Sequence, residues 1–324
     1  KPTKLISTLL LAILVSNGSM TLADYSRSYM DSHPMNYINT DGVEIAYQVL
    51  GPEDGETAVL VMGLGASHTV WGDDFVRGII AAGYRVVLID NRDTGESIKY
   101  PEKDNPVLWW QLLKYRLGMN VSTTYQLSDM AGDIIDVMDA LEIEEAHFLG
   151  HSTGGAIGQV VSIEHPNRLM SAVLYASWVK ADQFMKNVFD VRKTLLRESG
   201  GHAYARATPI FLYPDWWINA NEVALSELEK STVTNFPPVD IAISRCEAVL
   251  NFDRRAELSG IRVPTLVICA RDDFLTPMYC SQELAKKIPD AELVLLERGG
   301  HACSQTVVTE FNNLTLPWLL RQDE

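Results

Sequence analysis

The sequence predicts an α/β fold built on a mostly parallel sheet with helices on both faces. Short runs rich in Val, Ile and Leu, such as AVLVMG and TLVICA, alternate with longer stretches in which apolar residues recur three and four positions apart. Near-continuous apolar strands are typical of a sheet that is buried on both faces. Their alternation with helices indicates a doubly wound architecture.

Seven runs have the length and β-branched content of strands. They cover residues 43–50, 58–63, 84–90, 146–150, 170–176, 265–270 and 291–297. Helical periodicity follows several of them, at 73–83, 128–143 and 153–166. These elements predict a core made of residues 24–177 and 261–324.

The alternation stops between residues 178 and 260, where helical patterns surround the aromatic segment FLYPDWWI. This span predicts a helical cap inserted after the sixth strand. A second excursion, DNPVLWWQLLKYRLGMN, leaves the sheet after residue 100. Aromatic side chains in both segments either line an apolar pocket or pack the cap onto the core. The candidates for the pocket are Trp109, Trp110, Phe211, Tyr213, Trp216 and Trp217.

The first residues read as a secretory signal peptide. Two lysines precede the apolar stretch LISTLLLAILV, and small residues lead to a cleavage point after Ala23. The apolar stretch is too short for a typical span of about 20 residues, although an uncleaved anchor remains an alternative. We therefore expect residues 1–23 to direct export to a periplasm or to the medium, with no membrane span after cleavage.

Composition excludes some classes of function. The formal net charge of −15 argues against nucleic acid as a partner, because such proteins cluster Lys and Arg against phosphates. The four cysteines show no metal-ligand spacing, so we expect no metal site. In an exported protein Cys280 and Cys303 are candidates for a disulfide, although pairing does not follow from sequence. A monomer or a homodimer is expected.

Residues 150–154 read GHSTG, between a predicted strand and a predicted helix. In the pattern G-x-S-x-G the serine occupies a sharp strand-to-helix turn that exposes its hydroxyl. The glycines are needed because a Cβ at so tight a bend collides with its neighbours. The alternative is that the glycines only make a tight connection. Ser152 is therefore a candidate nucleophile.

A serine nucleophile needs a base that is oriented by an acid, and the chain offers both in the order Ser, Asp, His. Asp272 and Asp273 follow the strand TLVICA, and His301 follows the strand at 291–297 behind two glycines. Carboxyl ends of parallel strands meet at one edge of a sheet, where sites assemble. We favour Asp273 over Asp272 as the acid, and His301 over His151 as the base.

The oxyanion of an acyl-transfer intermediate needs backbone donors. We expect one from Thr153, directly after the serine, and a second from Leu64 in the loop MGLG. In the segment DNRDTGES, Arg92 and Asp93 are expected to brace neighbouring loops.

With these motifs in place, the chain resembles the α/β-hydrolase family over essentially its whole length after residue 23. The resemblance rests on VMGLG, DNRDTGES, GHSTGG, ARDDFLTP and GGHACS. It implies eight strands, a cap after the sixth strand, a Ser-His-Asp triad and no cofactor. Three segments of the cap and C-terminal half resemble the branch that contains the aminoacrylate hydrolase of bacterial pyrimidine breakdown. The export signal and Met62, where many relatives have histidine, depart from that pattern.

The expected function is a serine hydrolase that cleaves a carboxylic ester or lactone through an acyl-enzyme. The aromatic cap and acidic surface favour a hydrophobic, neutral or cationic substrate, of which a macrolide antibiotic is one example. The alternatives are a hydrolase of aminoacrylate, carbamate or another small acyl compound, and a binding protein without catalysis.

Overall fold

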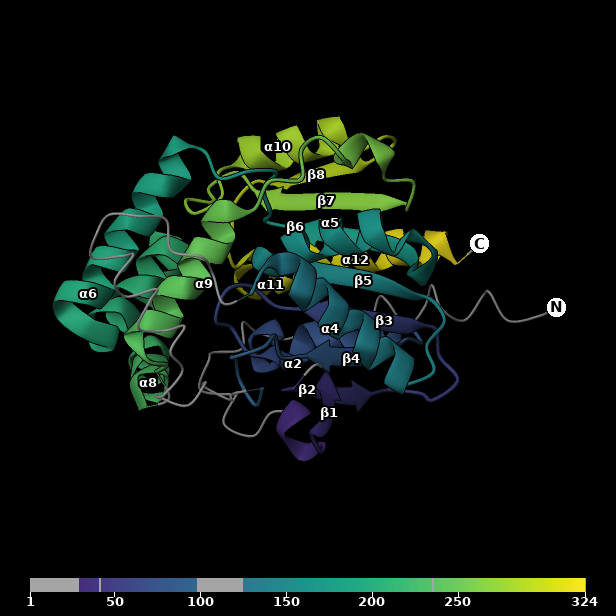
Figure 1. Ribbon diagram of the computed structural model, residues 1–324, viewed down its shortest axis with the longest axis horizontal. Coiled ribbons are helices and arrows are strands. Elements are labelled where there is room, and N and C mark those ends of the chain that lie inside the picture. Colours follow the sequence, from purple (N-terminus) through teal and green to yellow (C-terminus); the bar gives the residue numbers. More distant parts are fainter. Residues whose placement is uncertain (1–28, 41, 98–124, 235, 324) are drawn as a thin grey trace.

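The computed structural model describes residues 29–40, 42–97, 125–234 and 236–323. At its centre lies an eight-stranded sheet with the order β1-β2-β4-β3-β5-β6-β7-β8 (Figure 1). The pairs β1–β2 and β2–β4 are antiparallel and all other neighbours are parallel. The strands are β1 (Asn36–Thr40), β2 (Val43–Leu50), β3 (Thr57–Val61), β4 (Arg85–Ile89), β5 (Ala146–His151), β6 (Leu169–Tyr175), β7 (Thr265–Ala270) and β8 (Glu292–Leu296). The predicted eight-stranded, mostly parallel sheet is confirmed.

Helices cover both faces of the sheet and bury two separate apolar cores. Val59 and Val61 of β3 face one core and Leu60 faces the other, as alternation along a strand requires. The first core is covered by α4 (Leu127–Ala140), α5 (Thr153–Glu164) and α10 (Met278–Lys287). The second is covered by α2 (Asp73–Ala81) and α12 (Val308–Gln322).

A helical cap follows β6, as predicted, and projects beyond the sheet in Figure 1. It consists of α6 (Gln183–Leu212), α7 (Asp215–Ala220), α8 (Glu222–Thr234) and α9 (Val239–Asn251). Helix α6 is interrupted at Gly200, whose φ of 78° lies in the left-handed region that favours glycine. The short helix α11 (Cys303–Thr306) and the 3₁₀ turns Met30–Ser32, His68–Trp71, Pro166–Arg168 and Leu258–Gly260 complete the regular structure of the described residues.

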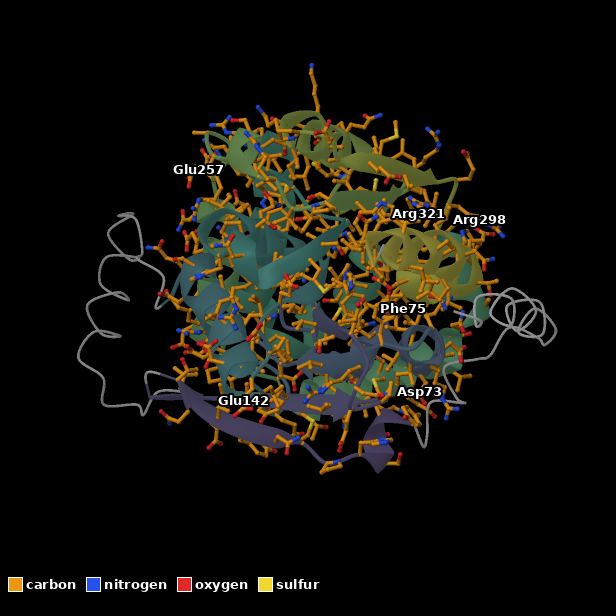
Figure 2. All side chains as sticks on the ribbon, turned by 90° about the vertical axis from the view of Figure 1, so that its right-hand side faces the viewer. Asp73, Phe75, Glu142, Glu257, Arg298 and Arg321 are labelled. Carbon is orange, nitrogen blue, oxygen red and sulfur yellow. The ribbon has the colours of Figure 1, made fainter. Side chains whose placement is uncertain are left out.

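Most charged side chains lie on the outside of the molecule, although a few, such as Lys193 and Arg245, are buried. Among the residues labelled in Figure 2, Glu142, Glu257, Arg298 and Arg321 are exposed, whereas Phe75 is fully buried. No helix among the described residues is long and apolar enough to cross a membrane. The proposed signal peptide at residues 1–23 lies outside the described residues.

All four cysteines are buried free thiols. The Cys280–Cys303 disulfide, considered from the sequence, is therefore absent from the structure. The two residues belong to different cores, on opposite faces of the sheet, which keeps their side chains apart.

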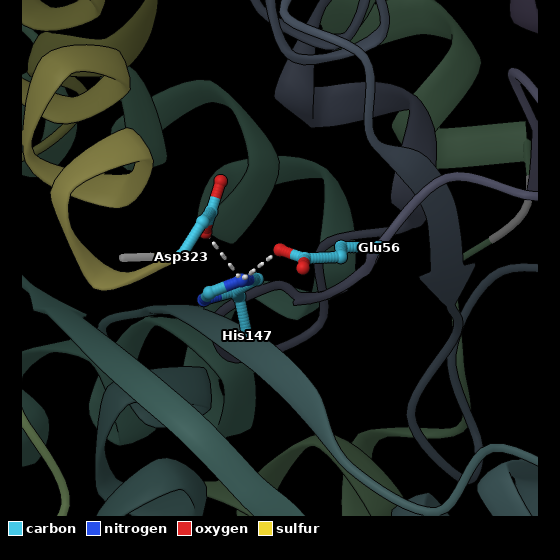
Figure 3. A group of neighbouring side chains, drawn as sticks. All are labelled: Glu56, His147 and Asp323. Carbon is cyan, nitrogen blue, oxygen red and sulfur yellow. Dashed lines mark ion pairs between the residues drawn. The ribbon is translucent and has the colours of Figure 1, made fainter. Parts of the chain in front are cut away.

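A cluster of ionisable side chains lies at the edge where the parallel strands begin. His147, fully buried near the start of β5, has its Nε2 3.6 Å from a carboxylate oxygen of Glu56 and 3.2 Å from one of Asp323 (Figure 3). The Tyr84 hydroxyl donates to the other oxygen of Asp323 (2.8 Å). Ser171 lies within hydrogen-bond distance of the His147 Nδ1. Asp323, which caps the C-terminal end of α12, is thereby held against β5.

Candidate active site

Ser152 stands between the end of β5 and the start of α5, with φ 53° and ψ −112°. A non-glycine residue in this region stores about 1–3 kcal/mol of strain, which the surroundings must hold in place. The Ser152 amide donates to the Tyr175 carbonyl (2.7 Å), and the Ser177 hydroxyl donates to the Ser152 carbonyl (3.1 Å). Neighbouring β6 and the residues after it therefore fix the backbone of the turn.

Glycine is required on both sides of this serine. A Cβ on Gly150 would lie 2.3 Å from the Gly154 carbonyl oxygen, and one on Gly154 would lie 2.0 Å from that of Val61. Neither distance is possible, and the nearest atoms are backbone, which cannot rotate away. The glycines are thus needed for close packing, which supports the interpretation of the turn as a nucleophile elbow.

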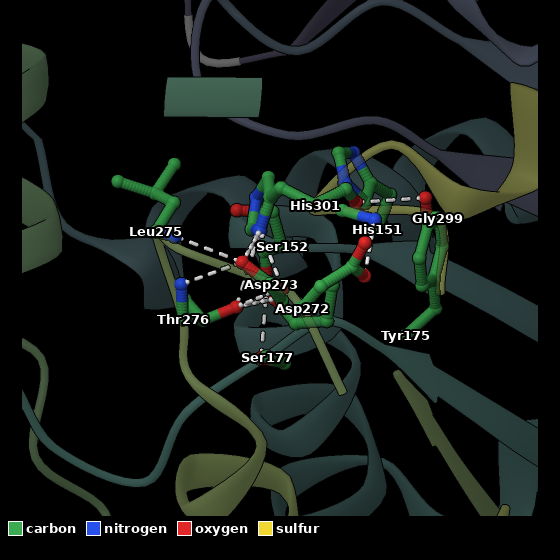
Figure 4. A network of polar contacts seen from close by, with 12 residues as sticks. His151, Ser152, Tyr175, Ser177, Asp272, Asp273, Leu275, Thr276, Gly299 and His301 are labelled. Carbon is green, nitrogen blue, oxygen red and sulfur yellow. Dashed lines mark hydrogen bonds and ion pairs between the residues drawn. The ribbon is translucent and has the colours of Figure 1, made fainter. Parts of the chain in front are cut away.

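Asp273 and His301 come together from the loops after β7 and β8 (Figure 4). The His301 Nδ1 lies 2.9 Å and 3.2 Å from the two carboxylate oxygens of Asp273. A carboxylate accepts, so Nδ1 carries the proton, and Nε2 of a neutral ring keeps its lone pair. Figure 4 shows the side chains of Ser152, Asp273 and His301 gathered in one cluster. Their exposed fractions are 7 %, 4 % and 1 %.

Asp273 is held by more than the imidazole. The amides of Leu275 and Thr276 each donate to its Oδ1 at 2.9 Å. The Thr276 hydroxyl lies 2.9 Å from both its Oδ2 and the Ala176 carbonyl. Asp272 has a different role. Its carboxylate accepts a hydrogen bond from the Gly300 amide (2.8 Å) and so braces the His301 loop.

The backbone of His301 is anchored at its carbonyl. The Tyr175 hydroxyl donates to it (2.9 Å), and so does the Nε2–H of His151 (3.1 Å). Because that nitrogen must carry the proton, His151 Nδ1 is the acceptor, and it has no hydrogen-bond partner among the described residues. Complete burial, followed by the charge of His301, keeps the pKa of His151 well below its ordinary value. His151 is thus a neutral packing residue rather than a base.

The loop after β3 lies directly against the elbow. A Cβ on Gly63 would come within 3.0 Å of the Ser152 Cβ and 3.2 Å of the His151 Nδ1. Leu64 and Thr153 both line the same small pocket, of about 300 Å³ empty volume. The two backbone groups expected to form an oxyanion hole are therefore next to each other and next to Ser152.

Besides Leu64 and Thr153, the lining of this pocket includes the side chains of Arg92 and Arg245. Arg92 pairs with the Asp133 carboxylate through its Nε and Nη2, both at 2.7 Å, which is the bracing expected of it. Arg245, from the cap helix α9, had no predicted role. It lies four residues after Ile241 and four before Val249, on the apolar stripe of the helix. A charged residue on an apolar stripe is the sequence feature that could have identified it. The pocket lining is completed by Gly63, Gly65, Asn91, Thr94, Tyr125, Leu127, Met130 and Ala248.

Of the aromatic side chains predicted for the pocket, the four that the structure describes are not among its lining residues. Tyr213 and Trp217 stack at 4.3 Å between ring centroids and pack with Ala302, beside His301. Arg298 covers the Trp216 ring at 4.7 Å, and Phe211 lies 6.2 Å from Phe274. These four residues lie at the junction of α6 and α7. They pack the cap against the loops that carry Asp273 and His301. Trp109 and Trp110 lie outside the described residues.

Comparison with known proteins agrees with this architecture. The family model described as alpha/beta hydrolase fold matches residues 59–303. A protein of Caulobacter sp. (strain K31) named, as an inferred assignment, carbamate hydrolase RutD is 35% identical over 270 residues, which is 83% of this chain and 92% of that protein. A protein of the same name from Pseudomonas syringae pv. syringae (strain B728a) is 36% identical over 269 residues, 83% of this chain and 95% of that one.

Solved structures show the same fold. The crystal structure of the enol-lactonase from Burkholderia xenovorans LB400 superposes with a TM-score of 0.74 at 25% identity, over 88% of this chain and 100% of that one. The family match covers most of the chain, including the elbow, the Asp273 loop and the His301 loop. The chain belongs to the α/β-hydrolase family.

Proposed function

We propose that this protein is a serine hydrolase acting on a small acyl substrate of the carbamate type. The observation that carries the proposal is the contact between His301 Nδ1 and Asp273 beside a serine on a strained elbow. An acid, an imidazole and a hydroxyl in this order form the arrangement that makes a serine nucleophilic.

The chemistry follows from these positions. The Ser152 hydroxyl attacks the substrate carbonyl while Nε2 of His301 takes its proton. Asp273 stays ionised and stabilises the imidazolium that forms. The backbone amides of Leu64 and Thr153 receive the negative charge of the tetrahedral intermediate. His301 then gives the proton to the leaving group, which departs and leaves the acyl group on Ser152. In the second half of the reaction water attacks the acyl carbonyl while His301 takes its proton, and His301 then returns the proton to Ser152 as the acyl group is released.

Two findings support a small substrate. The relatives of 35% and 36% identity that cover most of this chain are named for carbamate hydrolysis. The pocket beside Leu64 and Thr153 is small, because its empty volume of about 300 Å³ includes space that is open to solvent. A bulky lactone such as a macrolide gains no support from the described residues, whose cap aromatics pack against the core instead of lining this pocket.

A substrate panel tests the proposal. Purified protein and Ser152→Ala are compared on short carbamates, short esters, small lactones and a macrolide. We expect hydrolysis of the short substrates by the wild type, with loss of about 10⁶-fold in kcat in the variant, as for removal of a triad serine. Hydrolysis that survives in Ser152→Ala would show that another group does the chemistry.

A fluorophosphonate probe separates an enzyme from a binding protein of the same fold. We expect labelling of the wild type and none of Ser152→Ala. A folded wild type that resists the probe and turns over nothing in the panel would favour the binding protein.

Export is a separate proposal, supported by the lysines, apolar stretch and small residues of positions 1–23. Fractionation of cells expressing the full sequence, with N-terminal sequencing of the product, tests it. A product that starts at Asp24 outside the cytoplasm is expected, and an intact N-terminus on cytoplasmic protein would contradict export.

A further inference from the structure

Arg245 is a buried cation whose side chain faces the pocket next to the candidate oxyanion hole. It lies on α9 of the cap, is 8 % exposed and lines the same pocket as Leu64 and Thr153. Its Nη1 is 3.5 Å from the point that a Cβ on Gly65 would occupy, directly after Leu64. The guanidinium thus lies beside the loop that carries the amide of Leu64.

The Arg245 guanidinium has no ion-pair partner among the described residues. Its Nε is buried without a hydrogen-bond partner. No carboxylate oxygen of the described residues lies within 4.0 Å of its nitrogens, the limit for a salt bridge. Burying an unpaired charge is costly, so buried cations normally have a counter-ion. Within the described part of the chain, the guanidinium thus has the Tyr125 phenol as a hydrogen-bond partner but no carboxylate in contact, which suits an anionic ligand.

Arg192 and Lys193 are buried to a similar degree and Arg92 somewhat less, and each has partners among the described residues, although the Nε of Arg192 is also unpartnered. Arg92 has the Asp133 carboxylate, and Lys193 has Glu247 at 2.9 Å and Asp190 at 3.0 Å. Arg192 donates to the Tyr204 hydroxyl and lies over aromatic rings, 4.8 Å from that of Tyr204. Among the described residues, Arg245 differs from Arg92 and Lys193 because no carboxylate lies in contact with it.

The charge of Arg245 acts on four described ionisable groups, Asp93, Tyr125, Tyr204 and Cys246, of which Asp93 and Tyr125 lie on the core side of the pocket. Burial raises the pKa of Asp93, and the charges of Arg245 and Arg92 oppose this rise. Burial also raises the pKa of Tyr125 to about 12, against the charge of Arg245 and its hydrogen bond to the phenol. Asp93 thus supplies counter-charge beyond contact distance. A carboxyl group with a raised pKa is also easier to protonate when a second anion arrives.

We propose that Arg245 binds a carboxylate carried by the substrate and so selects short anionic acyl compounds over neutral ones. A guanidinium presents a fork of donors that fits a carboxylate, and in a pocket with little water this pairing is strong. The proposal rests on the proposed function of the same site. It reverses, for this pocket, the preference for neutral or cationic substrates that the net charge of −15 favours.

The test compares two aryl esters that differ only in charge, the 4-nitrophenyl monoester of succinic acid and the 4-nitrophenyl ester of butanoic acid. We expect the wild type to prefer the charged ester in kcat/KM. In Arg245→Met this preference should fall by about 10- to 100-fold, the range for hydrogen bonds to a charged group. Arg245→Lys should restore part of it, since the charge returns without the fork.

Lys286→Met is the matched control, because it removes one positive charge from an exposed position on α10. It should leave the preference unchanged. An equal loss on both esters in Arg245→Met would mean that Arg245 only supports the fold, and would overturn the proposal.

A binding measurement keeps the proposal testable even if neither ester is hydrolysed. Calorimetric titration of succinate and of the neutral succinamide into Ser152→Ala should show succinate binding that a further Arg245→Met substitution weakens by a similar factor. Failure of hydrolysis with Arg245-dependent succinate binding would refute the proposed function alone. Equal succinate binding with and without the Arg245→Met substitution would refute the role of Arg245.

Discussion

At the scale of single residues, Asp273 is held by more donors than its contact with His301 requires. Two amides and the Thr276 hydroxyl bond its oxygens besides the imidazole. These bonds fix the position and the plane of the carboxylate. They leave the imidazole with one tautomer, the one whose free nitrogen can act as a base.

Replacement of either of the two neighbouring aspartates separates their roles. Asp273→Asn should lower kcat by about 10⁴-fold, because the amide no longer holds the required tautomer of His301. Asp272→Asn removes only the charge of the group that braces Gly300 and should cost less than about tenfold, since an amide oxygen still accepts that bond. Steady-state kinetics of both variants on one ester decide the matter. Comparable losses would show that the assignment of the acid is wrong.

His151 should make the stability of the protein depend on pH. Its pKa in the fold lies well below the ordinary 6.5, so the unfolded chain binds a proton that the native state refuses. Stability is therefore full above 6.5 and falls as the pH drops below that value, by at most about 1.4 kcal/mol per pH unit for this group. Urea unfolding at pH 7.5, 6.5 and 5.5 measures the slope.

The comparison for this prediction is His151→Gln, which keeps an N–H for the His301 carbonyl but cannot be protonated. Its unfolding free energy should vary less with pH than that of the wild type. Parallel slopes for the two proteins would assign the pH dependence to other groups.

At the scale of elements, the elbow is a contact between the start of α5 and the strand β3. The helix can approach so closely only because Gly154 has no side chain facing the Val61 carbonyl. At this position close packing, more than helix propensity, determines how replacement of the glycine changes stability.

Two Gly→Ala substitutions should therefore have opposite effects. Gly154→Ala places a Cβ 2.0 Å from a backbone oxygen and should destabilise the protein severely. Gly132→Ala, inside α4, meets nothing within 4 Å and should raise stability by about 0.5–1 kcal/mol through helix propensity. Thermal unfolding of both proteins measures this. A Gly154→Ala protein as stable as the wild type would contradict the close packing.

The sequence predicts elements well where burial is complete. The run at 265–270 coincides with β7, and that at 43–50 with β2, because their apolar side chains face the interior. Strand β1 was missed because NYINT is an edge strand, largely exposed and without an apolar pattern. Chain order and strand ends were enough to bring Asp273 and His301 together.

The lining of the pocket could not be predicted in the same way. The segment that contains Tyr213 and Trp217 would be equally aromatic whether it lined a site or packed the cap onto the core. Composition therefore does not distinguish the two roles. Which helix face looks toward Leu64 depends on how the cap docks, and this is a tertiary property. Arg245 was overlooked for that reason.

At the scale of the whole molecule, the described chain is held together by burial rather than by cross-links. Its four cysteines are distributed over the cap and the core as free thiols. Burial raises the pKa of Cys269 to about 11 and that of Cys280 to about 12. Since the thiolate is the reactive form, these groups should be inert in the folded protein.

Thiol titration with Ellman's reagent should accordingly find no reactive group in the native protein and all four in denaturant. Addition of a reductant should leave the melting temperature unchanged. Fewer than four thiols in the denatured, unreduced protein would reveal a disulfide.

The contact of Asp323 with a fully buried imidazole has a practical consequence for anyone who handles this protein. Trimming the last residues, or fusing a purification tag in their place, would strip His147 of one of its two neighbouring carboxylates and Tyr84 of its acceptor. Extensions should begin after Asp323, so that the final helical turn keeps its place in the folded body.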